Sequence, residues 1–373
     1  MLEIPLSIKY RPKRLIDVIG QDVVVQSLTN AFKEGTLHHA YVFAGFLGSG
    51  KTSCARILAA MENNDDGPSL EPNPESRNCK EIFDGKSMDV RELDAASNRG
   101  VDDIRQISKD IRYAPMSCRV RYVIIDEAQS LTGIAAEAAL KMIEEPPPGV
   151  RFILATTEPH LIKDTIHSRC ISFKFHKISW NLLYEHLQKI AKLEGFEYEP
   201  DALKIAARSA SGSVRNALQN LQSLVNFCGK QKITLQAAEQ SLGWINEKIF
   251  FTLLEAIVNI DVFKGYQAIE NLLKTGNRCD YIIDGIYSHL RSLLLTRTCP
   301  KHLPEFGFSD EDIKRYSLQA NLVGVDAVLQ MMNFLVDVKR AMIFNIDPQV
   351  MLEKFLVDSV IWKKRAEAKK NIK

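Results

Sequence analysis

The segment 44–55, AGFLGSGKTSCA, constrains the chain most, because its glycines, lysine and threonine stand directly before a helical pattern. The glycines allow backbone angles at which successive N–H groups turn inward around phosphate. Lys51 adds a positive charge, Thr52 adds a hydroxyl for Mg²⁺, and the helix that begins here points the positive end of its dipole at the phosphates. The apolar run 40–44 before the loop is typical of a buried parallel strand. The sequence therefore predicts a nucleoside triphosphate site.

The residues expected to contact the phosphates follow one another along this loop: Gly45, Gly48, Ser49, Gly50, Lys51, Thr52 and Ser53. We expect ATP and Mg²⁺ as the cofactors. A base needs apolar walls more than charge, so Val18 and Ile19, which precede the first helical pattern, are expected to line an adenine pocket. The alternative is that this N-terminal segment only packs on the domain.

A pair of carboxylates follows the apolar run 121–125. Asp126 and Glu127 come at the carboxyl end of this predicted strand, and ligands of parallel sheets lie beyond such ends, where the phosphate loop also lies. Asp126 is expected to hold Mg²⁺ together with Thr52, and Glu127 is expected to orient or deprotonate an attacking water. The alternative is a strand end with two solvated acids.

Three further side chains are candidates for sensing or stabilising phosphate charge. Thr157 follows the predicted strand 151–154 and brings a hydroxyl toward the terminal phosphate, although threonine is common at strand ends. Arg169 is either a surface charge or a cation that stabilises a phosphoryl-transfer transition state. Arg215 lies in the first turn of a helix that Ser213 is expected to cap. Because cations are unfavourable at a helix start, this position favours an anion as the partner of Arg215.

Length and charge limit the kinds of protein this chain can be. A chain of 373 residues is too long for one ordinary core and predicts two or three domains. A composition of 46% hydrophobic and 25% charged residues is that of a globular protein. The formal net charge of +2 excludes a basic coat over the whole surface, so any contact with DNA has to come from a local patch.

The cysteines and the N-terminus indicate where the protein works. The seven cysteines are scattered without a CxxC pair, which is typical of reduced thiols in a cytosol and not of a disulfide framework. The N-terminal MLEIPLSIKYRP lacks the apolar stretch of a signal peptide, and no uncharged run reaches the ~18 residues of a membrane span. We therefore expect a soluble, intracellular protein with no membrane partner.

Strand and helix patterns alternate up to residue 178, which predicts an α/β domain with a parallel sheet. Strands are expected at 40–44, 87–93, 121–125 and 151–154, and helices at 23–35, 51–61, 101–111 and 133–144. Asp22 is expected to cap the first of these helices. Beyond residue 179 the patterns are helical, at 180–193, at 200–210, from Ser213 and within 246–362. The basic tail 363–373 is expected to fray.

Several motifs extend well beyond the phosphate loop: KYRPKRLIDVIGQ, HHAYVFAG, ELDAASNRGVDDIR, YAPMSCRVRYVIIDEAQSLT, ALKMIEEPPPGVRFILATTEP, SRC and SGSVRNAL. With them the chain resembles the bacterial DNA polymerase III gamma/tau family, the ATPase motors of sliding-clamp loaders in the AAA+ superfamily. The resemblance implies an α/β AAA+ P-loop core with a parallel sheet at 1–178, a small three-helix lid at 179–242 and an all-α collar for oligomerisation at 243–362. The basic tail at 363–373 would follow the collar.

The resemblance also implies roles for single residues. Asp126 and Glu127 match the Walker B pair, and Thr157 matches the first sensor. Arg169 in the SRC motif matches the arginine finger, which in this family reaches ATP held by the neighbouring subunit. Arg215 matches the second sensor, which reports on the nucleotide from the lid. An isolated subunit is then expected to hydrolyse ATP poorly, because part of the charge stabilisation comes from its neighbour.

The partners that the resemblance implies are a sliding clamp, other clamp-loader subunits joined through the collar, primer-template DNA and a DNA polymerase. The function would be to open the clamp and load it onto primed DNA during replication, in a bacterial or phage-infected cytoplasm. Contacts to DNA phosphates are expected from lysines and arginines, with Arg99 and Arg105 as candidates.

Three departures from the family are visible. The region 62–86 keeps only Cys79, where relatives usually carry four cysteines with zinc-binding spacing, so we expect that no zinc is bound. Gln129 stands where the family commonly has histidine. The chain also stops after the collar, so we expect a short form without the tau extension, from a bacteriophage or a divergent source.

Two other functions share these motifs. A DNA-remodelling or branch-migration ATPase of the AAA+ class would use the same phosphate loop and finger but would need no clamp. A structural clamp-loader subunit would bind ATP without hydrolysing it. The intact Lys51, Asp126, Glu127 and Arg169 argue against the structural alternative.

Overall fold

The computed structural model describes residues 4–97, 100–131, 133–244, 247–274, 279–306, 308–343 and 346–371. The chain folds into two compact units, Met1–Thr234 and Leu235–Lys373. The resemblance implies a lid that ends at 242, and the structure groups the helix after Thr234 with the second unit. Each unit has its own apolar core.

The first unit is built on a five-stranded sheet with the order β2-β3-β4-β1-β5, in which every paired strand is parallel. The strands are β1 (Ala40–Gly45), β2 (Val90–Asp94), β3 (Arg121–Asp126), β4 (Val150–Thr156) and β5 (Ile171–Phe175). The expected parallel sheet is therefore confirmed. The strands expected at 87–93, 121–125 and 151–154 appear as β2, β3 and β4, with ends that differ by up to three residues.

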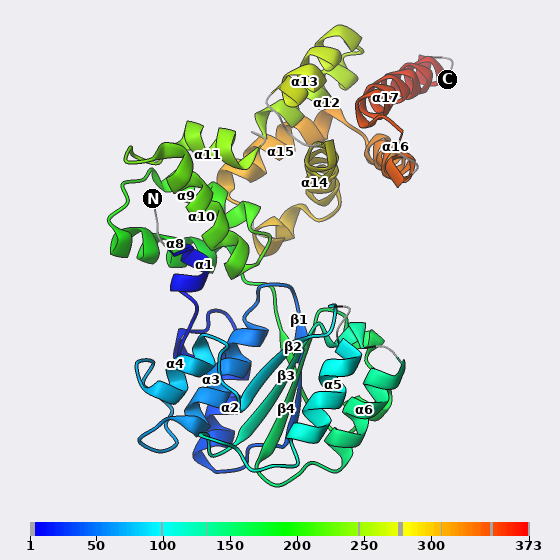
Figure 1. Cartoon of the computed structure of the whole chain (residues 1–373). Coiled ribbons are helices and arrows are strands. Elements are labelled where there is room, and N and C mark those ends of the chain that lie inside the picture. The colour runs from blue at the N-terminus through cyan, green and yellow to red at the C-terminus, as the bar shows by residue number, and fades with distance from the viewer. Residues whose placement is uncertain are drawn as a thin grey trace. The chain divides into compact units, whose positions relative to one another are not determined.

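Helices cover both faces of the sheet (Figure 1). One face carries α2 (Asp22–Lys33), α3 (Lys51–Asn63) and α4 (Arg77–Phe83), and the other carries α5 (Gly100–Asp110), α6 (Gly133–Glu144) and α7 (Asp164–His167). Successive side chains of β1 point to opposite faces of the sheet, so this one strand contributes to the apolar cores on both faces. Tyr41 and Phe43 are buried with α3, while Val42 is buried with α5 and α6.

The start of α2 differs from the expectation. The helix begins at Asp22 itself, and its N-cap residue is Gln21, which makes no capping hydrogen bond. The prediction that Asp22 caps this helix is therefore wrong. The Gln21 amide instead bonds the backbone of His176, donating to its carbonyl at 2.8 Å and accepting from its N–H at 3.0 Å. These two hydrogen bonds fix the position of the chain after β5. No local pattern in the sequence predicts them.

Three helices and the N-terminal arm complete the first unit. The helices are α8 (Trp180–Glu194), α9 (Pro200–Ser209) and α10 (Val214–Cys228), close to their expected ranges. Ser213 caps α10 as predicted, because its hydroxyl accepts the N–H of Asn216 at 3.2 Å. The arm contains α1 (Leu6–Lys9), and the Tyr10 hydroxyl donates to Glu194 at 2.6 Å. Short 3-10 turns occur at η1 (Leu15–Asp17), η2 (Ala128–Ser130) and η3 (Pro159–Leu161).

The described part of the second unit is helical. Its elements are α11 (Leu235–Leu242), α12 (Lys248–Val258), α13 (Val262–Lys274), α14 (Cys279–Thr298), η4 (Pro300–Phe306), α15 (Asp310–Leu322), α16 (Val325–Ile343) and α17 (Pro348–Asn371). The part of the basic tail that the structure describes, 363–371, is helical and continues α17, which differs from the expected fraying. No single helix among the described residues is long and apolar enough to cross a membrane. Within the part of the chain that the structure describes, one pair of helices, α15 with α16 up to Met342, passes the test when taken together, with a 96° bend between the two.

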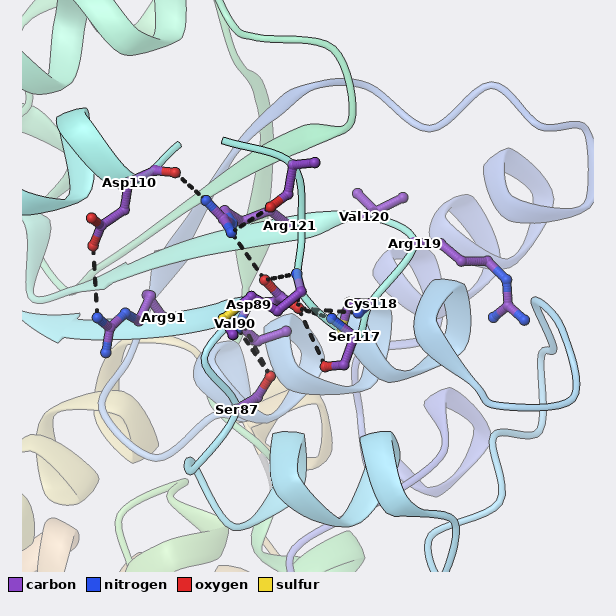
Figure 2. A network of polar contacts seen from close by, with 12 residues as sticks. Ser87, Asp89, Val90, Arg91, Asp110, Ser117, Cys118, Arg119, Val120 and Arg121 are labelled. Carbon is purple, nitrogen blue, oxygen red and sulfur yellow. Dashed lines mark hydrogen bonds and ion pairs between the residues drawn. The ribbon is translucent and has the colours of Figure 1, made fainter. Parts of the chain in front are cut away.

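A buried carboxylate ties the loop before β3 to the start of β2 (Figure 2). Asp89 is fully buried and accepts the backbone N–H groups of Met116, Ser117 and Cys118 at 2.8–3.0 Å. The Arg121 guanidinium donates to the same carboxylate at 3.0 Å. Burial alone would raise the pKa of Asp89, but the three N–H groups and the guanidinium stabilise its charge and lower the pKa to about 2.

Replacing Asp89 with asparagine is expected to lower the free energy of unfolding by about 2–4 kcal/mol, because the buried Arg121 loses its counter-charge. The matched control is Asp110→Asn. The half-exposed Asp110 carboxylate lies 3.7 Å from the Arg91 guanidinium, so its loss should lower the free energy of unfolding by less than about 1 kcal/mol. Urea unfolding followed by circular dichroism measures both.

The pH dependence of this stabilisation has a definite sign. Because the pKa of Asp89 is lower in the folded chain, its contribution is complete above about pH 4 and is lost as the pH falls toward 2. The wild-type chain should therefore lose stability over that range more steeply than Asp89→Asn. Parallel pH profiles of the two proteins would contradict the assignment.

Candidate nucleotide site

The phosphate loop joins the end of β1 to the start of α3. The helix begins at Lys51, directly after Gly50, which has a φ of +105°. The Lys51 side chain is almost completely buried, since its exposed fraction is 5%. Its ammonium donates to the carbonyls of Gly45 at 2.9 Å and Phe46 at 3.0 Å. Burial lowers the pKa of Lys51, while the nearby Asp126 and Glu127 oppose that shift.

A hydroxyl and a carboxylate meet across the sheet edge. The Thr52 hydroxyl donates to Asp126 Oδ2 at 2.8 Å, and Asp126 Oδ1 accepts the N–H of Glu127 at 3.0 Å. Burial raises the pKa of Asp126, while the two hydrogen bonds lower it. Mg²⁺ prefers oxygen ligands from one or two protein groups together with phosphate oxygens. The side chains of Thr52 and Asp126 are a donor set that fits this ion.

Glu127 has an unusual backbone conformation. Its φ of +48° and ψ of 45° lie in the left-handed region, which is uncommon for residues other than glycine. Its Oε2 atom accepts hydrogen bonds from Gln129 Nε2 at 2.7 Å and from the Thr157 hydroxyl at 3.2 Å. Residues held in such conformations concentrate at functional sites, where surrounding contacts stabilise them.

A cavity of about 510 Å³ opens beside these side chains, within the usual size of small-ligand sites. Its walls come from the phosphate loop, the end of β3, the N-terminal arm and the helices α8 and α10. The cavity brings together most of the residues expected from the sequence: Val18, Ile19, Gly48, Ser49, Gly50, Lys51, Thr52, Ser53, Asp126, Glu127 and Arg215. Gly45 and Thr157 do not line it and instead contact residues that do, Lys51 and Glu127.

The helix α10 contacts the phosphate loop directly. The N–H of Val214 donates to the carbonyl of Gly48 at 3.1 Å. A Cβ atom at Gly48 would lie 2.2 Å from the Ser213 hydroxyl oxygen and 3.1 Å from the Cβ of Arg215. A glycine is therefore required here by the approach of α10 as well as by its φ of +71°. The contact places Arg215 at the wall of the cavity.

Two wall residues give little or no signal in the sequence. Arg11, from the N-terminal arm, lines the cavity. Burial and the positive charges of Arg56 and Arg215 lower the pKa of Arg11, whereas the negative charges of Glu92 and Asp126 raise it. His186 of α8 lines the cavity, and its buried Nε2 atom has no hydrogen-bond partner among the residues that the structure describes.

Burial lowers the pKa of His186 to about 4. Arg11 belongs to the KYRP motif, whereas a histidine on an amphipathic helix gives no signal of its own.

Arg169 does not reach the cavity of its own chain. Its guanidinium forms an ion pair with Glu144 at 2.8 Å and donates to the Thr165 carbonyl at 2.8 Å, and 40% of its side chain is exposed. Of the two arginines expected to contact DNA, Arg99 lies outside the described residues, as does the side chain of Arg105.

Comparisons with known proteins identify relatives across most of the chain. A family model described as DNA polymerase III, delta subunit, matches residues 20–179, and one described as DNA polymerase III clamp loader subunit, ATPase lid domain, matches residues 183–225. The chain is 34% identical over 296 residues to DNA polymerase III subunit gamma of Buchnera aphidicola subsp. Schizaphis graminum, covering 79% of this chain and 81% of that protein.

A longer relative is DNA polymerase III subunit tau of Bacillus subtilis, 34% identical over 350 residues. The match covers 93% of this chain but 62% of the tau protein, so the chain spans less than two thirds of that relative. Among solved structures, the RuvB Holliday junction branch migration motor of Thermotoga maritima aligns with a TM-score of 0.48 at 20% identity, over 72% of this chain and 86% of RuvB. A likeness at that level says nothing about function.

Replacing Gly48 with alanine is expected to weaken ATP binding by at least about tenfold, or 1.4 kcal/mol, because the added methyl group would displace α10 from the loop. Gly35→Ala is the matched control, since its φ of +67° is similar and, apart from its chain neighbours, no atom of the described residues lies within 4 Å of the added Cβ. Calorimetric titration with ATP compares the two variants. Equal affinities would contradict a site shaped by the α10 contact.

Proposed function

Because this chain belongs to the DNA polymerase III gamma/tau family, we propose that it is an ATP-hydrolysing motor subunit of a sliding-clamp loader. In this proposal it helps to open a clamp and to load it onto primer-template DNA. The observation that carries the proposal is the shared cavity, in which Lys51, the Thr52–Asp126 pair and Glu127 lie within reach of one polyphosphate.

In this proposal, the residues around the cavity have separate roles in binding and hydrolysing ATP. The loop N–H groups and Lys51 bind the phosphates, and Val18 and Ile19 contact the adenine. Thr52 and Asp126 would hold Mg²⁺, which neutralises phosphate charge when bound. Glu127 accepts a proton from a water molecule as the water oxygen attacks the terminal phosphorus. The bond to the leaving ADP oxygen then breaks, and ADP and phosphate result.

Arg169 is proposed to act on a neighbouring subunit. Its side chain lies outside the cavity of its own chain, and its exposed ion pair with Glu144 costs little to break. A positively charged finger supplied by another subunit can raise the rate of phosphoryl transfer by ~10³ to 10⁵. Arg215 and Thr157 would then report the state of the nucleotide to α10 and to Glu127 within the same chain.

The other partners follow from the same proposal. Further loader subunits would join through the helices of 243–362, and the assembly would bind a sliding clamp, a DNA polymerase and primer-template DNA. Contacts to DNA phosphates release counterions, so binding should weaken steeply as salt increases.

The ATPase rate of the assembled loader should rise when clamp and primed DNA are added together, because those two components align the subunit interfaces. Long duplex DNA without clamp should not produce that rise. A steady-state phosphate-release assay measures both conditions. Full stimulation by duplex alone would indicate a DNA-remodelling or branch-migration motor instead, and tight ATP binding without turnover would indicate a structural subunit.

Glu127→Gln should reduce turnover by the assembled loader by about 10² to 10⁴, the usual loss when a general base is removed. The ATP affinity should stay within about threefold, since the phosphate loop is unchanged. The matched control is Glu158→Gln, an exposed glutamate just beyond β4. Rapid-quench kinetics and calorimetry measure the rate and the affinity, and an unchanged rate would remove Glu127 from the mechanism.

A further inference from the structure

The side chain of Gln129 links the ends of two strands beside the cavity. Gln129 lies in η2, directly after β3, and its Nε2 atom donates to Glu127 Oε2 at 2.7 Å and to the Thr157 hydroxyl oxygen at 3.0 Å. Its Oε1 atom accepts the hydroxyl of Thr156, the last residue of β4, at 2.7 Å. The amide therefore contacts Glu127 on one side and the end of β4 on the other.

The Glu127 carboxylate determines which way the Gln129 amide faces, because an ionised carboxylate only accepts hydrogen bonds and the amide atom 2.7 Å from it must be the donor Nε2. Gln129 Oε1 then faces the Thr156 hydroxyl, which donates to it at 2.7 Å and accepts the N–H of Glu158 at 3.0 Å. Thr156 is completely buried, which prevents water from competing for that bond. The amide nitrogen of Gln129 consequently points at Glu127.

The two oxygens of Glu127 have different surroundings. Oε2 receives the hydrogen bonds from Gln129 and Thr157, whereas Oε1 accepts none from the part of the chain that the structure describes. A carboxylate anchored through one oxygen keeps its orientation while the other oxygen stays available to a water molecule. Because Gln129 carries no charge, it orients the carboxylate without neutralising it.

We propose that Gln129 is a positioning residue for hydrolysis: it anchors Oε2 of Glu127, so that Oε1 accepts the proton of the attacking water. This inference rests on the proposed ATPase function. It assigns a role to the Gln129 side chain, which contacts Glu127, Thr156 and Thr157. A misplacement of the base by about 1 Å can cost 10²-fold in rate, so the loss of the shorter of the two hydrogen bonds to Oε2 matters.

The test replaces Gln129 with methionine, which has a similar length and no hydrogen-bonding amide. In the assembled loader, the single-turnover rate of ATP hydrolysis should fall by about tenfold or more, while the Kd for ATP stays within about twofold. The matched control is Gln106→Met on α5, because the exposed Gln106 amide also donates to a carboxylate, that of Asp110, at 2.9 Å. This control should keep the wild-type rate.

Two further variants separate positioning from a general loss of structure. Thr156→Val removes the hydroxyl that donates to the amide oxygen of Gln129 and should reproduce part of the loss in rate, even where Gln129→Met fails to fold. In a Glu127→Gln background, Gln129→Met should cause no additional loss, because the side chain that it positions no longer acts as a base. Without nucleotide, the backbone amides of residues 126–131 should exchange hydrogen faster in Gln129→Met than in the Gln106→Met control.

The outcomes distinguish this inference from the function on which it rests. A wild-type loader that hydrolyses no ATP overturns the proposed function and this role with it. A wild-type loader that turns over while Gln129→Met and Thr156→Val match its single-turnover rate overturns the positioning role alone. Equal losses of rate from Gln129→Met in the wild-type and Glu127→Gln backgrounds would also overturn it.

Discussion

The hydrogen bond between Thr52 and Asp126, 2.8 Å long, is the interaction on which the rest of the site depends. It forms because β1 and β3 both pair in parallel with β4, so that the loop after one strand and the carboxylates after the other meet at one sheet edge. Burying the Asp126 carboxylate is costly, and the hydroxyl together with a backbone N–H offsets that cost. A shift of one residue in β3 would turn the Asp126 side chain to the opposite face of the sheet.

The sequence predicts the features that depend on residues close to one another in the chain. The phosphate loop follows from glycine spacing, α6 lies at its expected residues because prolines stop it after Glu144, and the Ser213 cap needs only its own turn. Contacts between distant segments leave no such signal. Gln21 bonds the backbone at His176, 155 residues away, which no helix-start pattern predicts. Arg11 likewise reaches the cavity only because the N-terminal arm joins α8 and α10.

The cavity lies between two parts of the first unit: the sheet edge with α3 on one side, and α10 on the other. Lys51, Thr52 and Asp126 are fixed to the sheet and α3, whereas Arg215 arrives on α10 through the contact between Val214 and Gly48. Nucleotide contacts on both sides would couple the phosphates to the position of the α10 helix. Because Arg169 lies outside the cavity and pairs with Glu144, we propose that it stabilises the negative charge of the transition state in a neighbouring subunit.

The most direct measurement of that claim is the ATPase rate of the chain at a known state of assembly, monitored by native mass spectrometry. A proven monomer should turn over slowly, and assembly should raise the rate by ~10³ to 10⁵ unless Arg169 is replaced by alanine. Arg77→Ala, which removes another surface arginine paired with a glutamate, should leave the rise intact. A monomer that hydrolyses ATP at the assembled rate, with or without Arg169, would contradict the account.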